Sequence, residues 1–306
     1  MKNLTNLFIL SFFILSLAQN KGLLAAAVYK KGHTVYAWVD NLRLRHRPSS
    51  KAKTVDYIGE GEKLTLLGKQ SKAKLRLKLR GKTFREPWVK VRTLYNTTGW
   101  VYGGAVRKRK VPLKPRLLFP SSYHFDEVTS KSGTSFLTLV KRKNRYSLVP
   151  GRVIVKKAPD PIYEEETGKK VLVKGIRGKA IFMIKGLNLK PRSYVKNVSK
   201  YTYNGLNHRG IKLKIRKGSS YYLNVKCSEE YGCKIYLQNG KTQTVLENYG
   251  GYISAIWKGD INGDGALDFL ISYSGDNSLT EVLFLSSRKG GKIFLKPVVK
   301  LHTVGC

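Results

Sequence analysis

The chain has 306 residues, enough for two or three domains, and its 58 Lys and Arg against 19 Asp and Glu give a formal net charge of +39. Such a charge lies far outside the balance of an ordinary soluble protein and predicts attraction to polyanions. Acidic residues are sparse and the five histidines show no metal-ligand spacing, so a hydrolase of any kind is disfavoured and a zinc hydrolase has no support.

The first eighteen residues, 1–18, have the pattern of an export signal. Lys2 gives a short positive start, residues 7–17 are almost wholly apolar, and residues 16–18 supply small side chains for cleavage. The apolar run falls short of the roughly 20 residues of a membrane-spanning helix, although an uncleaved anchor or a later cut at the alanines 25–27 stays open. We expect an exported protein, periplasmic, surface-associated or secreted, with no transmembrane span in the mature chain.

Short runs with period-two alternation recur along the chain, while helical periodicity is almost missing, so we expect an all-β fold. The clearest run is Lys-Leu-Arg-Leu-Lys-Leu-Arg at residues 74–80. Successive side chains of a strand point to opposite faces. The leucines should therefore face a core, and the opposite face should present a polyanion-binding row of four cations, Lys74, Arg76, Lys78 and Arg80.

Four segments between His33 and Arg107 carry a family resemblance. They are Val39 to Ser49 with Asn-Leu-Arg-Leu-Arg and a Pro-Ser turn, Ile58 to Leu64 with Gly-Glu, Trp88 to Val91, and Thr98 to Tyr102 with Gly-Trp-Val. In order and spacing they resemble the bacterial Src-homology-3 domain family, over about a quarter of the chain. The resemblance implies a small β-barrel at residues 33–107 that targets the cell wall or surface without catalysis, often by recognising peptide or peptidoglycan. A long insert at residues 68–86 departs from the family pattern.

The aromatic residues of this module suggest a ligand face. Trp88, Trp100 and Tyr102 could gather on one side of the barrel and stack on a ligand, with Arg43 and Arg45 of the first motif beside them. The alternative is that one or both tryptophans belong to the core.

A basic, proline-bearing stretch follows the module. Residues 108–170 contain Pro112, Pro115 and Pro120, which cannot continue a central strand, and predict a linker with irregular β structure. Residues 171–306 then predict a C-terminal antiparallel β-domain.

The C-terminal domain contains a calcium-type loop at residues 260–268. Oxygen-bearing side chains stand at loop positions one, three, five and nine, position six is glycine, and position seven offers a backbone carbonyl. The expected ligands of a structural Ca²⁺ ion are Asp260, Asn262, Asp264, Ala266 through its carbonyl, and Asp268. The flanks look like strands, as in FG-GAP-type loops, and a metal-free hairpin turn is the alternative.

Three cysteines fit an oxidising compartment. Cys227 and Cys233 are spaced to staple a hairpin tip, whereas Cys306 has no obvious partner. No nucleophile elbow or other catalytic signature is present, so we expect no enzyme and no catalytic residues.

Two functions remain in competition, and a secreted inhibitor or toxin is a weaker third. The first is a binding or scaffolding protein of the bacterial envelope whose barrel docks on cell-wall peptide or peptidoglycan. The second is a secreted polyanion binder, whose ligand is lipopolysaccharide, teichoic acid, a glycosaminoglycan or extracellular nucleic acid. Residues 69–114 favour the second, because they hold many cations and one acid, Glu86.

Overall fold

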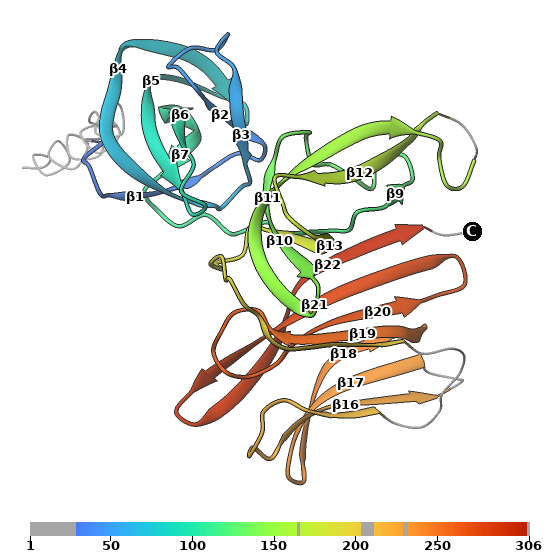
Figure 1. Ribbon diagram of the computed structural model, residues 1–306. Coiled ribbons are helices and arrows are strands. Elements are labelled where there is room, and N and C mark those ends of the chain that lie inside the picture. Colours follow the sequence, from blue (N-terminus) through green and yellow to red (C-terminus); the bar gives the residue numbers. More distant parts are fainter. Residues whose placement is uncertain (1–28, 164–165, 203–210, 229–231, 305–306) are drawn as a thin grey trace, which may run out of the picture.

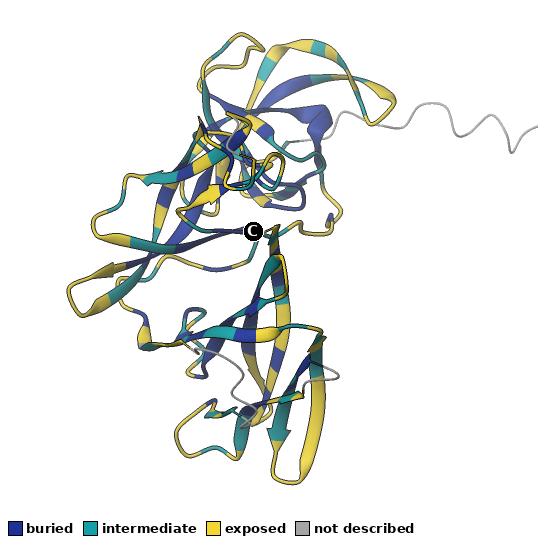
Figure 2. Ribbon diagram, turned by 90° about the vertical axis from the view of Figure 1, so that its right-hand side faces the viewer, coloured by how far each residue is buried: buried dark blue, intermediate teal, exposed yellow. Residues whose placement is uncertain are grey.

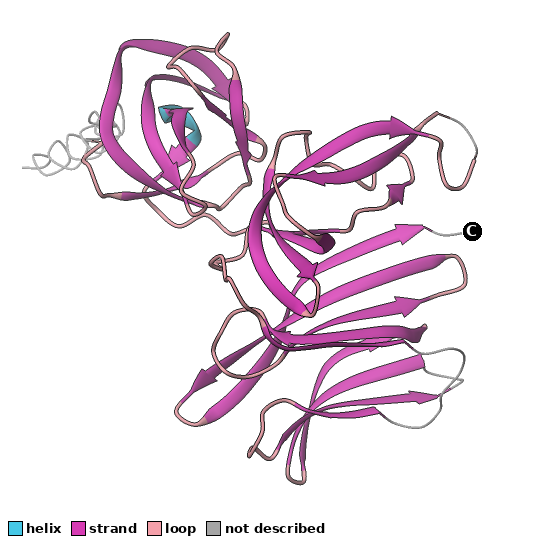
Figure 3. Ribbon diagram, in the orientation of Figure 1, coloured by secondary structure: helices cyan, strands magenta, loops and turns pink. Residues whose placement is uncertain are grey.

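The computed structural model describes residues 29–163, 166–202, 211–228 and 232–304, and these residues form strands joined by turns (Figures 1 and 3). The only helical segment among them is the 3-10 turn η1 (Gly103–Ala105). Within these ranges there is no helix with the length and apolar character needed to cross a membrane. The predicted export signal at residues 1–18 and Cys306 lie outside the described residues.

The first sheet closes into the N-terminal barrel, which confirms the predicted fold. Its strands run in the order β3-β2-β6-β5-β4-β1-β7. The bounds are β1 (Thr34–Ala37), β2 (Leu42–Arg45), β3 (Thr54–Ile58), β4 (Lys63–Leu79), β5 (Lys82–Thr93), β6 (Thr98–Tyr102) and β7 (Val106–Arg107). Alternate residues of these strands meet inside, including Val35, Leu44, Val89 and Val101, none of which is more than 1 % exposed.

The second sheet has six antiparallel strands in the order β8-β13-β10-β11-β12-β9. They are β8 (Arg116–Leu118), β9 (Ser122–Tyr123), β10 (Ser135–Arg142), β11 (Arg145–Ala158), β12 (Gly168–Lys174) and β13 (Lys179–Lys185). The expected division between a linker, 108–170, and a C-terminal domain, 171–306, falls inside β12 and is corrected here. The prolines precede short edge strands, and the chain between them and Lys185 forms one continuous ladder.

The third and fourth sheets complete the molecule. The third has the order β14-β19-β20-β21-β22 and the fourth β15-β16-β17-β18. Their strands are β14 (Lys196–Thr202), β15 (Ile211–Lys214), β16 (Tyr221–Ser228), β17 (Gly232–Asn239), β18 (Thr242–Tyr249), β19 (Tyr252–Asp260), β20 (Asp268–Ser274), β21 (Ser278–Lys289) and β22 (Lys292–Val304).

The third sheet is the middle layer of a three-sheet stack that lies below the barrel in Figure 1. Trp257, Leu270 and Leu283 face the second sheet and join its core, whereas Phe269 and Phe284 face the fourth sheet. Because neighbouring side chains of one strand point to opposite faces, two cores share one sheet. Figure 2 shows the corresponding pattern, with buried segments in the strands and exposed ones at the hairpin tips.

A buried ionic contact joins the barrel to the second sheet. Lys185 Nζ lies 3.1 Å from Glu62 Oε1, and the two side chains are 2 % and 9 % exposed. The same ammonium donates to the Ser135 carbonyl at 3.1 Å, and the Ser135 amide donates to Asp56 Oδ1 at 2.8 Å. Arg116 pairs with Asp40 at the edge of this junction. The barrel is therefore held in one orientation by groups that are costly to separate.

Candidate functional site: the basic hairpin of the barrel

The insert in the barrel is a long hairpin formed by β4 and β5. Arg80 and Gly81 connect the strands with φ values of 48° and 78°, as a two-residue turn with left-handed backbone requires. Leu75, Leu77 and Leu79 are half-buried and pack against the barrel core. The alternation predicted for residues 74–79 is therefore present, with the apolar side chains facing inward.

The opposite face of the hairpin carries exposed cations from both strands. Arg76 lies directly across from Arg85, and Lys74 and Lys78 lie across from Pro87 and Thr83. Within the ranges that the structure describes, Lys74, Arg76, Lys78 and Arg85 make no ion pair or hydrogen bond to an acid. Like charges directly opposite one another are destabilising in a sheet. This set, called here the basic face, is therefore a surface that an anion would stabilise.

Arg80 does not belong to the basic face, which corrects the predicted row of four. It lies in the turn, where its guanidinium pairs with Glu60, and Lys114 Nζ lies 3.0 Å from the same carboxyl. Burial raises the pKa of Glu60, but hydrogen bonds from Lys114 and Arg80 outweigh that effect and keep the pKa below its usual value. Arg85, which the alternation of β4 alone did not include, takes the fourth place.

A cluster of aromatic and cationic side chains lies near the turn of the hairpin. The Arg107 guanidinium carbon is 3.8 Å from the centre of the Trp38 ring, and that of Arg80 is 5.3 Å away. Phe84 meets Trp38 edge to face, with ring centres 5.5 Å apart. The two guanidinium groups therefore make cation–π contacts with the Trp38 ring. The sequence interpretation missed this cluster, although a tryptophan directly before the Val-Asp-Asn-Leu motif was a signal.

The predicted aromatic ligand face does not form. Trp88 and Tyr102 are 7 % and 3 % exposed and contact each other inside the barrel, with ring centres 6.1 Å apart. The Tyr102 hydroxyl lies 2.8 Å and 2.9 Å from the carbonyl oxygens of Leu75 and Phe84, which ties the hairpin to the barrel. Both residues are therefore structural.

The remaining predicted ligand residues differ in how far they are exposed to solvent. Arg45 is buried, donates to the Ala52 carbonyl at 2.6 Å, and has its guanidinium 5.9 Å from the Trp88 ring centre. Arg43 is exposed and Trp100 is half-buried. Only these last two are accessible to a ligand from outside.

The predicted calcium loop joins β19 and β20 and has strands on both sides, as expected. Asp260 accepts hydrogen bonds from the amides of Gly263 and Gly265, at 2.6 Å and 3.2 Å. Asn262 accepts one from Asp264, and Asp264 accepts one from Ala266. The loop is therefore curled by its own side chains.

Asp268 closes the loop from the buried side. Its carboxylate accepts hydrogen bonds from the backbone amides of Ile261, Asn262 and Ser286 and from the Ser286 hydroxyl. Burial raises its pKa to about 7, against the effect of these hydrogen bonds. The all-oxygen donor set suits a hard cation, but the described residues contain no group of three or more His, Cys, Asp or Glu arranged to hold a metal. Calcium binding stays a prediction.

The predicted disulfide is present. Cys227 on β16 and Cys233 on β17 are directly paired across the hairpin and bonded. The tip between them includes residues outside the described ranges.

A search of the curated proteins finds no match to this chain. Residues 40–107 match the family model of the bacterial SH3 domain, in agreement with the barrel, its strand order and the motifs in its sequence. This part of the chain is similar to the bacterial SH3 domain, and its fourth and fifth strands are extended into a basic hairpin.

Proposed function

We propose that this protein is a non-catalytic, exported binding protein of the bacterial envelope that docks on anionic surface polymers through the basic face of its barrel. The observation that carries the proposal is that four exposed cations on one hairpin face, Lys74, Arg76, Lys78 and Arg85, have no acidic partner among the described residues. A polymer with regularly spaced phosphate or sulfate groups supplies the missing charge. Lipopolysaccharide, teichoic acid and glycosaminoglycans share this chemistry.

Two further features support the envelope setting. The leader pattern at residues 1–18 favours export, and the disulfide fits an oxidising compartment. Bacterial SH3 domains commonly serve as cell-wall binding modules, which agrees with the match at residues 40–107.

A second candidate ligand, wall peptide or peptidoglycan, is favoured by that family match. Its contacts would come from Trp100 and Arg43, because Trp88 and Tyr102 are in the core. This mode depends on stacking and would respond little to salt, whereas the basic-face mode releases counterions and would respond strongly.

The salt dependence of binding separates the two modes. Changing Lys74, Arg76, Lys78 and Arg85 to Ser should lower the log–log salt slope for duplex DNA, used as a probe polyanion, by between about three and four, or about 0.9 per contact. The side chains are exposed, so the barrel should stay folded. The matched control changes Lys217, Lys241, Lys289 and Lys292, which are exposed cations on other hairpins, to Ser.

The control should keep most of the parent slope if the basic face is the site. Equal loss in both variants would mean that total charge alone attracts the polymer. An unchanged slope, with binding to purified peptidoglycan lost on Trp100→Ala, would replace the basic face by the wall-peptide mode.

A further inference from the structure

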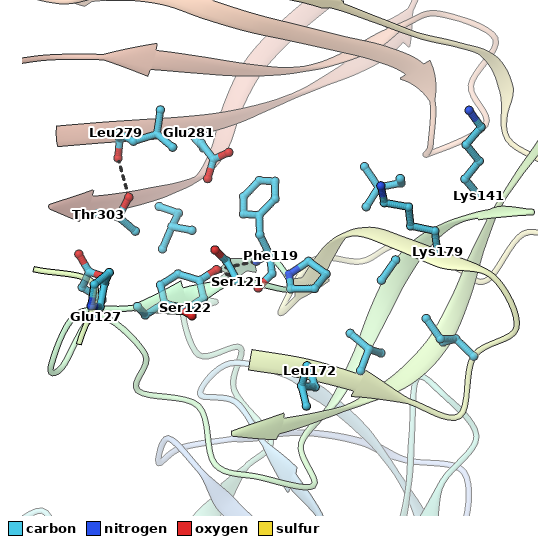
Figure 4. Close-up of a pocket in the computed structure, with 18 of the residues that line it drawn as sticks. Phe119, Ser121, Ser122, Glu127, Lys141, Leu172, Lys179, Leu279, Glu281 and Thr303 are labelled. Carbon is cyan, nitrogen blue, oxygen red and sulfur yellow. Dashed lines mark hydrogen bonds between the residues drawn. The ribbon is translucent and has the colours of Figure 1, made fainter. Parts of the chain in front are cut away.

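The second and third sheets separate at one end of their sandwich and leave a groove of about 1180 Å³ (Figure 4). This exceeds the roughly 300–1,000 Å³ usual for small-molecule pockets, so the groove has room for an elongated ligand. The third sheet contributes Leu279, Glu281, Leu301 and Thr303. These residues share one face, because Glu281 is paired with Leu301 and Leu279 with Thr303.

One end of the groove carries two lysines side by side. Lys141 on β10 and Lys179 on β13 are direct cross-strand partners, and both are exposed. Lys141 Nζ lies 5.7 Å from the ring centre of Tyr146, which is its cross-strand partner on β11. Among the described residues neither lysine has an acidic partner. The sheet therefore holds two like charges together at the mouth of the groove, at a cost that a bound anion would relieve.

Beyond these two lysines the lining is mostly apolar, with polar side chains from Ser121, Ser122, Lys174, Lys200 and Thr303 among it. The ring of Phe119 stands in its middle, between the lysine end and the third sheet (Figure 4). Leu279 and Leu301 approach from the third sheet, and Ile181 lines the same space from β13.

The two carboxyls that line the groove are engaged by the fold itself. Both oxygens of Glu127 accept backbone amides, from His124 at 2.8 Å and from Val304 at 2.6 Å. Glu281 is 9 % exposed, and burial raises its pKa to about 7, so it is largely neutral in mildly acidic solution.

We propose that this groove binds a long-chain lipid anion, with the headgroup held by Lys141 and Lys179 and the acyl chain lying along Phe119, Leu279 and Leu301. Charge complementarity at one end and a mostly apolar lining along the rest favour this occupant over a sugar, which would need polar partners throughout, and over a cationic amphiphile. The site is separate from the basic face and does not depend on the polymer-binding function.

The proposal can be tested by titrating the full chain with sodium decanoate, dodecanoate and tetradecanoate below their micelle concentrations, using calorimetry. Affinity should rise by a factor of about four per added methylene while the chain still fits. Dodecylamine, which has the same tail and the opposite charge, should bind at least tenfold more weakly than dodecanoate.

Two pairs of substitutions locate the headgroup. Lys141→Ser with Lys179→Ser should weaken dodecanoate binding by about three- to tenfold. Arg142→Ser with Arg145→Ser is the matched control. Arg142 follows Lys141 and pairs with Arg145 across the β10–β11 hairpin, so this change removes the same charge, but both arginines alternate to the other sheet face. The control should bind as the parent does.

Leu279→Asp tests the acyl channel, since Leu279 is half-buried near the start of β21 and the variant can be checked for folding by its melting transition. Loss of binding in the folded variant supports the proposal. No binding of any fatty acid, equal binding of dodecylamine, or equal weakening by both charge pairs would overturn it. So would binding of an unstructured peptide in place of dodecanoate.

Discussion

Glu281 shows how one residue can link stability to pH. It lies in the groove wall, where the nearby charged and titratable groups are Lys200 on β14 and Tyr123 on β9, and the Ser272 hydroxyl is 3.4 Å away. Desolvation raises the pKa from 4.5 to about 7. Between these values the folded chain keeps a proton that the unfolded chain releases, so the free energy of unfolding falls as pH rises and levels off above about 7.

Glu281→Gln should remove this fall in the free energy of unfolding with rising pH. The difference in unfolding free energy between variant and parent should change by up to about 3 kcal/mol from pH 4.5 to 8. Urea unfolding across that range measures it, and taking the difference cancels the similar contribution of Asp268. Parallel curves for parent and variant would show that Glu281 ionises normally in the fold.

At the level of single side chains, the sequence predicted some positions correctly and could not predict others. The alternation of residues 74–79 fixed which side chains face inward, because a strand leaves them no choice. It could not show that Arg80 turns toward Glu60, 20 residues away, or that Trp88 is core while Trp38 is half-buried beneath Arg107. Those outcomes depend on contacts between distant strands, which local pattern does not contain.

At the scale of elements, hairpins were predictable and sheet membership was not. The hairpins of the barrel, the disulfide hairpin and the β19–β20 pair all join neighbours in sequence, so turn chemistry and alternation identify them. In contrast β14 pairs with β19, and the whole fourth sheet lies between them in sequence. Similarly β8 pairs with β13 across four intervening strands. Such pairings place β8 to β11 and the start of β12 in one sheet, where the prolines predicted a linker with irregular β structure.

The loop between β19 and β20 gives a prediction at this scale. Calcium should raise the melting temperature, because a ligand bound only by the folded state adds about 1.4 kcal/mol at tenfold its Kd. Asp264→Ala should remove the response, whereas Asp276→Ala, which removes an exposed acid from the next hairpin turn, should keep it. Differential scanning calorimetry with and without calcium measures both. A shift of the same size in Asp264→Ala would mean that the loop is a turn held by its own hydrogen bonds.

The whole molecule is a barrel fixed to a three-sheet stack, and the two proposed ligand surfaces lie on different parts of it. The basic face lies on the barrel, and the groove lies between the second and third sheets. The buried contact of Lys185 with Glu62 holds the barrel in place, so the two surfaces keep a fixed relation. If both proposals hold, a polymer and a lipid would bind at separate places and would not compete for one site.

The junction should also couple the barrel to the stack during unfolding. Lys185→Met removes the buried partner of Glu62 and leaves an uncompensated carboxylate, which should cost about 3–5 kcal/mol, and adding Glu62→Gln should recover part of that loss. Lys114→Met is the matched control, because Lys114 pairs with Glu60 but is 64 % exposed, and exposed pairs contribute about 0–1 kcal/mol. Urea unfolding followed by tryptophan fluorescence reports on the barrel through Trp88 and on the stack through Trp257. In the parent the two should unfold in one transition, and in Lys185→Met the barrel should unfold first. Equal costs for Lys185→Met and Lys114→Met, with a single transition in both, would show that the buried pair does not hold the barrel to the stack.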